Sequence, residues 1–208
     1  MIFLQCKINQ PTCFKGRNLK TLINKYFNIL LILFFITPLE ASLTEPVDIV
    51  KEIFHLAKDG QIKKNKNYQL KIEKMFNFEV MSQDILGKDY LKYGKKEFNW
   101  FHTTIKGIIT KTVYPKAPKF LKQVTVEYQN IEKVEKSAVV FSIVKSKGEE
   151  TEVNYNLKFI NNDWMVTNIT IDDESWVENI SEKVQNVIKK KKWKGLKNLL
   201  TKKLNELK

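Results

Sequence analysis

The 208-residue sequence has two cysteines, Cys6 and Cys13, and none after them. Without cysteine, residues 42–208 have no disulfide, no thiol nucleophile and no thiolate metal ligand, so they are expected to fold by packing alone. Two isolated histidines, His55 and His102, do not make a zinc site without several carboxylates. The sequence also lacks a Gly-x-Ser-x-Gly elbow and a phosphate-binding glycine loop. These absences favour a binding protein over an enzyme.

One uninterrupted apolar run lies near the start of the chain, at residues 29–36. Basic residues precede the run and the small residue Ala41 follows it, which is the pattern of a secretory signal peptide. The run is shorter than the roughly 20 apolar residues that cross a bilayer. We therefore expect residues 1–41 to be a signal peptide and residues 42–208 to be one domain that works outside the cytoplasm. An uncleaved N-terminal anchor is the alternative.

Positive charge dominates the composition, with a formal net charge of +13. Residues 42–208 hold 31 lysines and 22 acids, which leaves a net charge of +9. Such a balance suits anionic surfaces, but export argues against nucleic acid as the partner. The densest cluster, residues 189–194, contains Trp193. Two interpretations of it stay open: a face for an anionic membrane or an acidic docking surface, and a solvated basic tail.

Apolar residues in the first half recur at three- and four-residue spacing, which predicts amphipathic helices. The expected helices cover residues 46–57, 68–76, 78–86 and 95–114. Gly87 ends the third helix, and Pro115 and Pro118 end the fourth. His102 lies beside the apolar stripe of the fourth helix, so we expect a half-buried histidine satisfied by a neighbour.

The pattern then changes to a period of two, which predicts four successive strands joined by short turns. The expected strands cover residues 124–128, 138–144, 153–159 and 164–171. Expected turns lie near residues 132–133, 146–148 and 161–163. The second strand, apolar on both faces, should be the most buried. Ser175 and Glu178 form a capping box that starts the first of two closing helices. The order predicts an α+β fold with a four-stranded antiparallel curved sheet packed against several helices.

Two stretches resemble a known family. The first is residues 75–90, MFNFEVMSQDILGKDY, followed by the long helix that ends at Tyr114. The second is residues 163–171, DWMVTNITI, followed by SWVEN at 175–179. With the closing segment around Leu200, they resemble the MlaC family of periplasmic phospholipid shuttles, also called the toluene-tolerance auxiliary family. The chain is identified as a divergent member, because Asn77 and Asn168 stand where the family usually has Asp.

The resemblance implies a glycerophospholipid cargo whose acyl chains lie in an apolar cavity between sheet and helices, with the headgroup near solvent. It also implies a periplasmic monomer without a cofactor or a nucleic-acid partner. Such a carrier moves lipid between an outer-membrane lipoprotein complex and an inner-membrane ABC transporter complex, which maintains outer-membrane lipid asymmetry. The expected cavity-lining residues are Met81, Phe101, Ile105 and Ile109 from helices and Val140, Tyr155, Leu157, Val166 and Ile169 from strands.

Two other functions stay open at this point. Each cavity candidate is also an ordinary core residue by its pattern, so the chain is alternatively an exported binding or scaffold domain without a lipid ligand. The third hypothesis is an exported hydrolase whose carboxylates converge from distant positions. Adjacent acids, such as Asp172 and Asp173, are expected to be solvated turn residues.

Overall fold

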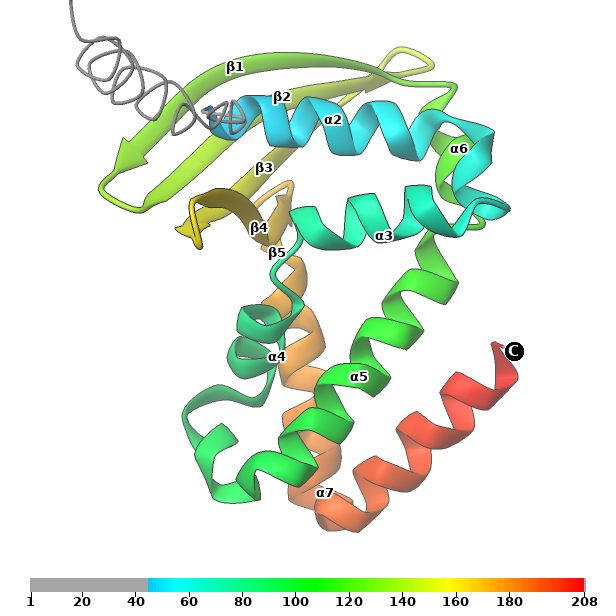
Figure 1. The fold of residues 1–208 in the computed structure, drawn as a ribbon, viewed down its shortest axis with the longest axis vertical. Coiled ribbons are helices and arrows are strands. Elements are labelled where there is room, and N and C mark those ends of the chain that lie inside the picture. The colour runs from blue at the N-terminus through cyan, green and yellow to red at the C-terminus, as the bar shows by residue number, and fades with distance from the viewer. Residues whose placement is uncertain (1–44, 208) are drawn as a thin grey trace, which may run out of the picture. The chain divides into compact units, whose positions relative to one another are not determined.

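The computed structural model describes residues 45–207, which form an α+β fold (Figure 1). The expected signal peptide lies outside the described residues. None of the described helices combines the length and the hydropathy of a membrane-spanning segment. The elements before the sheet are α2 (Pro46–Lys58), η1 (Gly60–Lys63), α3 (Lys66–Met75), α4 (Phe78–Leu86), η2 (Gly87–Tyr93), α5 (Gly94–Val113) and α6 (Ala117–Leu121). The remaining elements are β1 (Thr125–Val134), β2 (Ser137–Ser146), β3 (Glu149–Ile160), β4 (Asp163–Ile171), β5 (Glu174–Ser175) and α7 (Trp176–Glu206).

The strands pair in chain order, β1-β2-β3-β4-β5, and every neighbouring pair is antiparallel. The register shifts once between β1 and β2 and once between β3 and β4. Such irregularities bend strands, and the sheet in Figure 1 is curved, as predicted. The expected strand count of four was one too few: β5 has two residues, too few to show a period of two.

The strand alternation buries three residues of β2, namely Ala138, Val140 and Ser142. The prediction that this strand is the most buried is therefore only half right, because β4 also buries three residues. Thr167 is one of them, and it lies where the β3–β4 register shifts. A bulge interrupts the alternation of side chains between the two faces of a sheet. The sequence pattern did not reveal this bulge.

Two of the three expected turns are confirmed. Gly148 and Asn161 have positive φ angles of 86° and 53° at the predicted positions. The turn expected near residues 132–133 was wrong, because β1 continues to Val134 and the chain turns at residues 135–136. Glu135 adopts a φ of 51° there. Glutamate is uncommon in this left-handed region, so the sequence carried no turn signal.

The helix boundaries follow their expected start and stop residues. Ser175 caps α7, since the Glu178 backbone N–H donates to its Oγ at 3.2 Å. Gly87 ends α4 with a φ of 66°, the conformation that glycine adopts at low cost. Asn77 caps α4 by accepting from the Val80 N–H at 2.9 Å. Asparagine is as good a cap as aspartate, so this departure from the family pattern keeps the helix start.

The described residues bury two apolar cores. The first lies between the sheet and α2 and α3, which cross one face of it, and it includes Val140, Leu157 and Val166 (Figure 1). The second lies among α4, α5 and α7, and it includes Met81 and Phe101. Phe76, between α3 and α4, packs against both. The two cores are therefore in contact through an apolar side chain.

The two closing helices expected from the sequence are present under the single label α7, and they meet at a sharp bend at Lys192, where φ is 57°. We call residues 176–191 its N-terminal half and residues 193–206 its C-terminal half. Gly195 is required at the bend, because a Cβ there would lie 2.3 Å from the Lys191 Cβ. The C-terminal half returns along α5, where a Cβ at Gly107 would lie 3.2 Å from Leu204. Small residues thus bring the two helices together.

Candidate functional site

The first apolar cavity, the sheet-side cavity, has a volume of about 250 Å³. It lies where the α3–α4 junction, the end of α5, the edge of β4 and the start of α7 meet. Val113 and Ile171 lie at its mouth, with 42% and 45% of their surface exposed. The lining residues are Phe76, Phe78, Ile109, Val113, Tyr114, Ile169, Ile171 and Trp176.

Backbone pairing fixes the α3–α4 junction on the sheet. Phe76 forms an isolated parallel bridge with Val166, and the Asn77 N–H donates to the Val166 carbonyl at 2.9 Å. The rings of Phe76 and Phe78 stack at a centroid distance of 5.6 Å. The cap and the bridge therefore hold both rings at the cavity wall.

Asn168 joins β4 to the start of α7. Its Nδ2 donates to Ser175 Oγ at 3.0 Å, and its Oδ1 accepts from the Val177 N–H at 3.2 Å. Ser175 Oγ in turn accepts from the Glu178 N–H. This network satisfies amides that the first helical turn leaves without partners, and it places Trp176 at the cavity.

The second apolar cavity, the helix-side cavity, has a volume of about 210 Å³. It lies between α5 and the two halves of α7. Lys183 and Lys203 are its charged lining residues. The apolar ones are Ile105, Ile108, Ile109, Ile180, Val184, Val187, Leu196, Leu199 and Leu200. Ile109 lines both cavities, so its side chain is the wall that they share.

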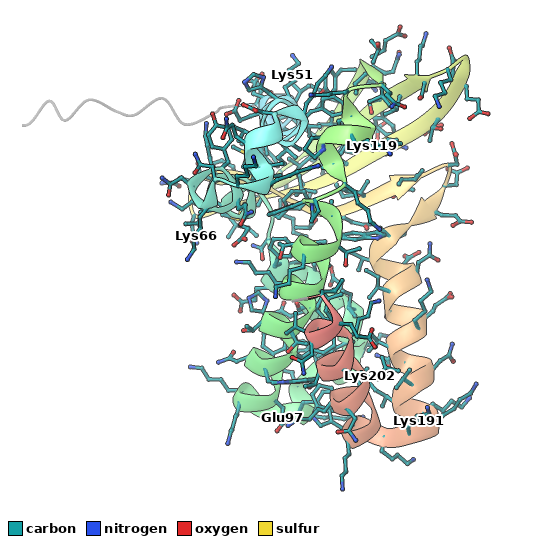
Figure 2. All side chains as sticks on the ribbon, turned by 90° about the vertical axis from the view of Figure 1, so that its right-hand side faces the viewer. Lys51, Lys66, Glu97, Lys119, Lys191 and Lys202 are labelled. Atoms are coloured by element: carbon teal, nitrogen blue, oxygen red, sulfur yellow. The ribbon has the colours of Figure 1, made fainter. Side chains whose placement is uncertain are left out.

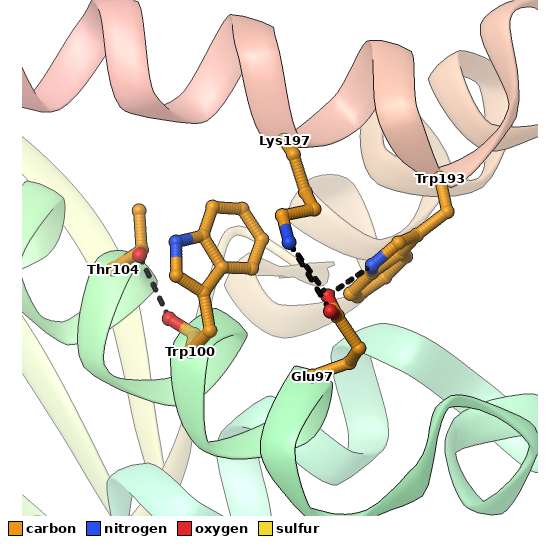
Figure 3. A network of polar contacts seen from close by, with 5 residues as sticks. All are labelled: Glu97, Trp100, Thr104, Trp193 and Lys197. Carbon is orange, nitrogen blue, oxygen red and sulfur yellow. Dashed lines mark hydrogen bonds and ion pairs between the residues drawn. The ribbon is translucent and has the colours of Figure 1, made fainter.

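A polar network holds the C-terminal half of α7 on α5 (Figure 3). Glu97 Oε2 accepts from Trp193 Nε1 at 2.6 Å and pairs with Lys197 Nζ at 3.0 Å. The hydrogen bonds from Trp193 first and Lys197 second hold the pKa of the Glu97 carboxyl below its usual value. The Trp193 ring stacks on Tyr93 at 4.0 Å and meets Trp100 edge-on at 5.9 Å. Trp193 therefore packs inside the fold and does not project with the lysines around it.

Tyr114 lines the sheet-side cavity and carries a buried hydroxyl. The residue is 8% exposed, and its hydroxyl has no hydrogen-bond partner among the described residues. Burial, and to a lesser extent the Glu73 carboxylate, raises the pKa of Tyr114 far above its usual value. The hydroxyl therefore keeps its proton and is a donor without an acceptor, which is costly for a buried polar group.

The nine expected lipid-contact residues fall into three groups. Ile105, Ile109 and Ile169 line the cavities. The five strand candidates share one face of the sheet, because Tyr155 is opposite both Val140 and Ile169, and Leu157 is opposite Val166. Met81, Phe101, Val140, Leu157 and Val166 are at most 1% exposed and belong to the packed cores. Tyr155 packs against the first core, where burial raises its pKa to about 12.

The sequence patterns missed the aromatic lining of the sheet-side cavity. Phe76, Tyr114 and Trp176 each lie at the end of a helix. A large apolar residue at a helix end does not continue the three- and four-residue spacing of an amphipathic helix. A pattern based on that spacing therefore does not identify it. Phe76 and Trp176 lie next to the capping residues Asn77 and Ser175 and Tyr114 lies before Pro115, and these helix-end positions were the signal that would have found them.

His102 and Ser82 lie close together but do not form a catalytic pair. His102 Nδ1 lies 3.4 Å from Ser82 Oγ and 3.2 Å from the Phe78 carbonyl oxygen, which confirms the expected satisfied histidine. The buried Ser82 hydroxyl donates to that same Phe78 carbonyl at 2.7 Å. This is the ordinary back-bond of a helical serine. In residues 45–207, no group of three or more metal-ligating side chains is present.

Three comparisons place this geometry among known proteins. The family model described as MlaC protein matches residues 44–203. The fold is similar to the solved phospholipid-binding protein from Ralstonia solanacearum in complex with a phospholipid, with a TM-score of 0.66 and 21% sequence identity. That similarity covers 80% of this chain and 99% of the other. No curated protein matches the chain.

Proposed function

We propose that this chain, which belongs to the MlaC protein family, is a periplasmic carrier of glycerophospholipid. The observation that carries the proposal is the pair of apolar cavities that share Ile109. The acyl chains enter these cavities, and the headgroup stays at the mouth. The fold of a protein solved with bound phospholipid supports the same ligand class.

The physics of the cargo requires such an enclosure. Each methylene kept from water contributes about 0.8 kcal/mol, so a diacyl lipid does not cross an aqueous compartment alone. The same lipid gains a comparable free energy in a bilayer, so exchange between carrier and membrane is close to balanced. Speed and direction then come from docking partners. We place the chain between an outer-membrane lipoprotein complex and an inner-membrane ABC transporter complex, with residues 1–41 as its export signal.

Lipid entry must widen the cavities. Their volumes of about 250 and 210 Å³ lie below the roughly 300–1,000 Å³ of pockets for drug-sized ligands. The Ile109 side chain separates them, so a rotamer change there joins them into one path along α5. The path ends at the C-terminal half of α7, which the network around Glu97 holds in place.

Tyr114 supplies a polar contact for the cargo. The ester carbonyls of a glycerophospholipid are acceptors that border its acyl chains, and the Tyr114 hydroxyl is a buried donor without an acceptor. We assign this hydroxyl to a lipid ester oxygen. The remaining headgroup meets no such buried partner, so weak headgroup selectivity follows.

The Tyr114→Phe variant is predicted to raise the stability of the lipid-free protein and to lower its affinity for phospholipid. Removing an unpaired buried hydroxyl should raise the stability of the lipid-free protein by about 1 kcal/mol, while losing the ester hydrogen bond should weaken lipid binding roughly five- to tenfold. Thermal unfolding of delipidated protein and titration with a fluorescent phospholipid measure the two effects. Unchanged lipid affinity would remove Tyr114 from the site.

Extraction of lipid from vesicles tests the proposed function. Vesicles of phosphatidylethanolamine and phosphatidylglycerol with a trace of fluorescent phospholipid are mixed with delipidated protein, and the two are separated by flotation. Transfer of close to one lipid per chain to the soluble fraction is the expected result. A folded, monodisperse protein that extracts none would leave the scaffold domain as the better hypothesis.

A further inference from the structure

The net charge of the exported chain gathers at one end of the helical layer. Residues 88–97 and 189–197, which we call the basic tip, hold ten lysines against Asp89 and Glu97, a net charge of +8. The rest of residues 42–208 holds 21 lysines and 20 acids. Almost all of the net charge of the exported chain therefore lies at this tip. It is not spread evenly over the surface, as a charge that serves only solubility would be.

Aromatic and polar contacts hold the two segments of the tip together. Tyr93 stacks on Trp193 at 4.0 Å, and Glu97 binds Trp193 and Lys197. Figure 2 shows Lys191 and Glu97 at the same end of the molecule, far from Lys66 and Lys119. The exposed lysines of the tip are Lys88, Lys92, Lys95, Lys96, Lys189, Lys190, Lys191, Lys192 and Lys194.

The clustering of lysines at the tip has an electrostatic cost in the folded protein. Exposed Lys189, Lys190 and Lys191 follow one another directly before the bend, and Lys192 has a φ of 57° at the bend itself, so like charges are crowded there and repel each other. Glu97, an acid within the tip, is already engaged by Trp193 and Lys197. An external anionic partner would offset this repulsion.

The chemistry of the tip favours a bilayer over a protein. The tip presents its positive charge as nine exposed lysines on two segments, a spread-out pattern that suits the diffuse field of an anionic lipid surface. Leu91, with 73% of its surface exposed, lies between Lys88 and Lys92. An exposed apolar side chain in a lysine-rich segment is the combination that binds at an anionic lipid surface.

We infer that the basic tip docks this protein on the surface of a bilayer that contains anionic phospholipid. The inference rests on the proposed function, since a lipid carrier must return to a membrane. Docking through the tip places the bend of α7 against the headgroups. The helix-side cavity begins directly behind that bend, at Leu196.

Vesicle flotation with charge-reversed variants tests the inference. The chain is expressed with its leader, purified from the periplasm and mixed with vesicles of 70% phosphatidylethanolamine and 30% phosphatidylglycerol or with neutral phosphatidylcholine vesicles. The tip variant is Lys189→Glu/Lys190→Glu/Lys191→Glu. The control, Lys58→Glu/Lys66→Glu/Lys119→Glu, makes the same change in net charge at exposed sites outside the tip.

We expect the wild type and the control to bind anionic vesicles and the tip variant to bind at least roughly tenfold less. High salt should abolish the difference by screening. If the tip variant misfolds, the milder Lys→Gln triple at the same three positions replaces it. Equal binding by tip variant and control would overturn the inference. Absence of wild-type binding to anionic vesicles would also overturn it and point to an acidic protein partner.

The lipid content of the same preparations separates the two hypotheses. A tip variant that keeps its bound phospholipid while losing vesicle binding supports docking as a function distinct from the cavity. If none of the proteins carries lipid, the proposed function fails, and the flotation result still decides whether the tip binds anionic bilayers.

Discussion

Replacing Ile109 with tryptophan is expected to lower the affinity for phospholipid about tenfold to hundredfold while the protein stays folded. Ile109 lines both cavities, so an indole ring there fills space that the acyl chains need. Overfilling a packed site costs about 1–3 kcal/mol, and each 1.4 kcal/mol is tenfold in affinity. In the free protein the ring enters the existing cavities, so the cost falls mainly on the bound state.

The Thr103→Trp variant is the matched control for Ile109→Trp. Thr103 is an exposed residue of the same helix, and it lines neither cavity. Titration of delipidated protein with a fluorescent phospholipid compares the two variants, and near-ultraviolet circular dichroism reports the fold. Wild-type affinity in Ile109→Trp would show that the lipid does not occupy these cavities.

Replacing Trp193 with alanine is expected to cause a large loss of stability. The ring contacts Tyr93, Trp100 and Phe101, and its Nε1 donates to Glu97. Truncating a large packed aromatic costs about 3–5 kcal/mol, which corresponds to a melting temperature roughly 6–20 °C lower for a protein of this size. The C-terminal half of α7 should detach first, because this side chain holds it at the bend.

The Trp193→Phe variant separates packing from the hydrogen bond. It keeps an aromatic ring and removes the Nε1 donor to Glu97, so a smaller loss of stability than that of Trp193→Ala is expected, because a hydrogen bond to a partly solvated carboxylate contributes less than the packing of the ring. Differential scanning calorimetry compares both variants with the wild type. A wild-type melting temperature for Trp193→Ala, with reduced vesicle binding, would instead assign Trp193 to the membrane surface.

Local patterns predicted most of the secondary structure because local chemistry determines it. The Ser175 cap, the Gly87 stop and the turns at Gly148 and Asn161 each act through residues that favour one backbone conformation. The exceptions lack such a residue. Glu135 turns the chain in a conformation that glutamate seldom adopts, and β5 is too short to form a pattern.

The placement of Trp193 and of the cavities could not be predicted from local patterns. Trp193 lies within a run of lysines, and its partners Tyr93 and Glu97 lie about 100 residues earlier. The cavities depend on how the α5–α7 layer meets the edge of β4. The bulge at Thr167 brings Ile169 opposite Tyr155, and local alternation could not show this bulge or that Ile169 lines a cavity while Tyr155 packs into the core.

Mass spectrometry of bound lipid is the most direct test of the carrier function. The protein is expressed with its leader, purified from the periplasm without detergent and extracted with organic solvent. Glycerophospholipid at close to one molecule per chain, reduced in Ile109→Trp and retained in Thr103→Trp, is the expected result. A folded, monodisperse wild-type protein that yields no phospholipid would contradict the carrier function and favour a scaffold domain with a self-filled core.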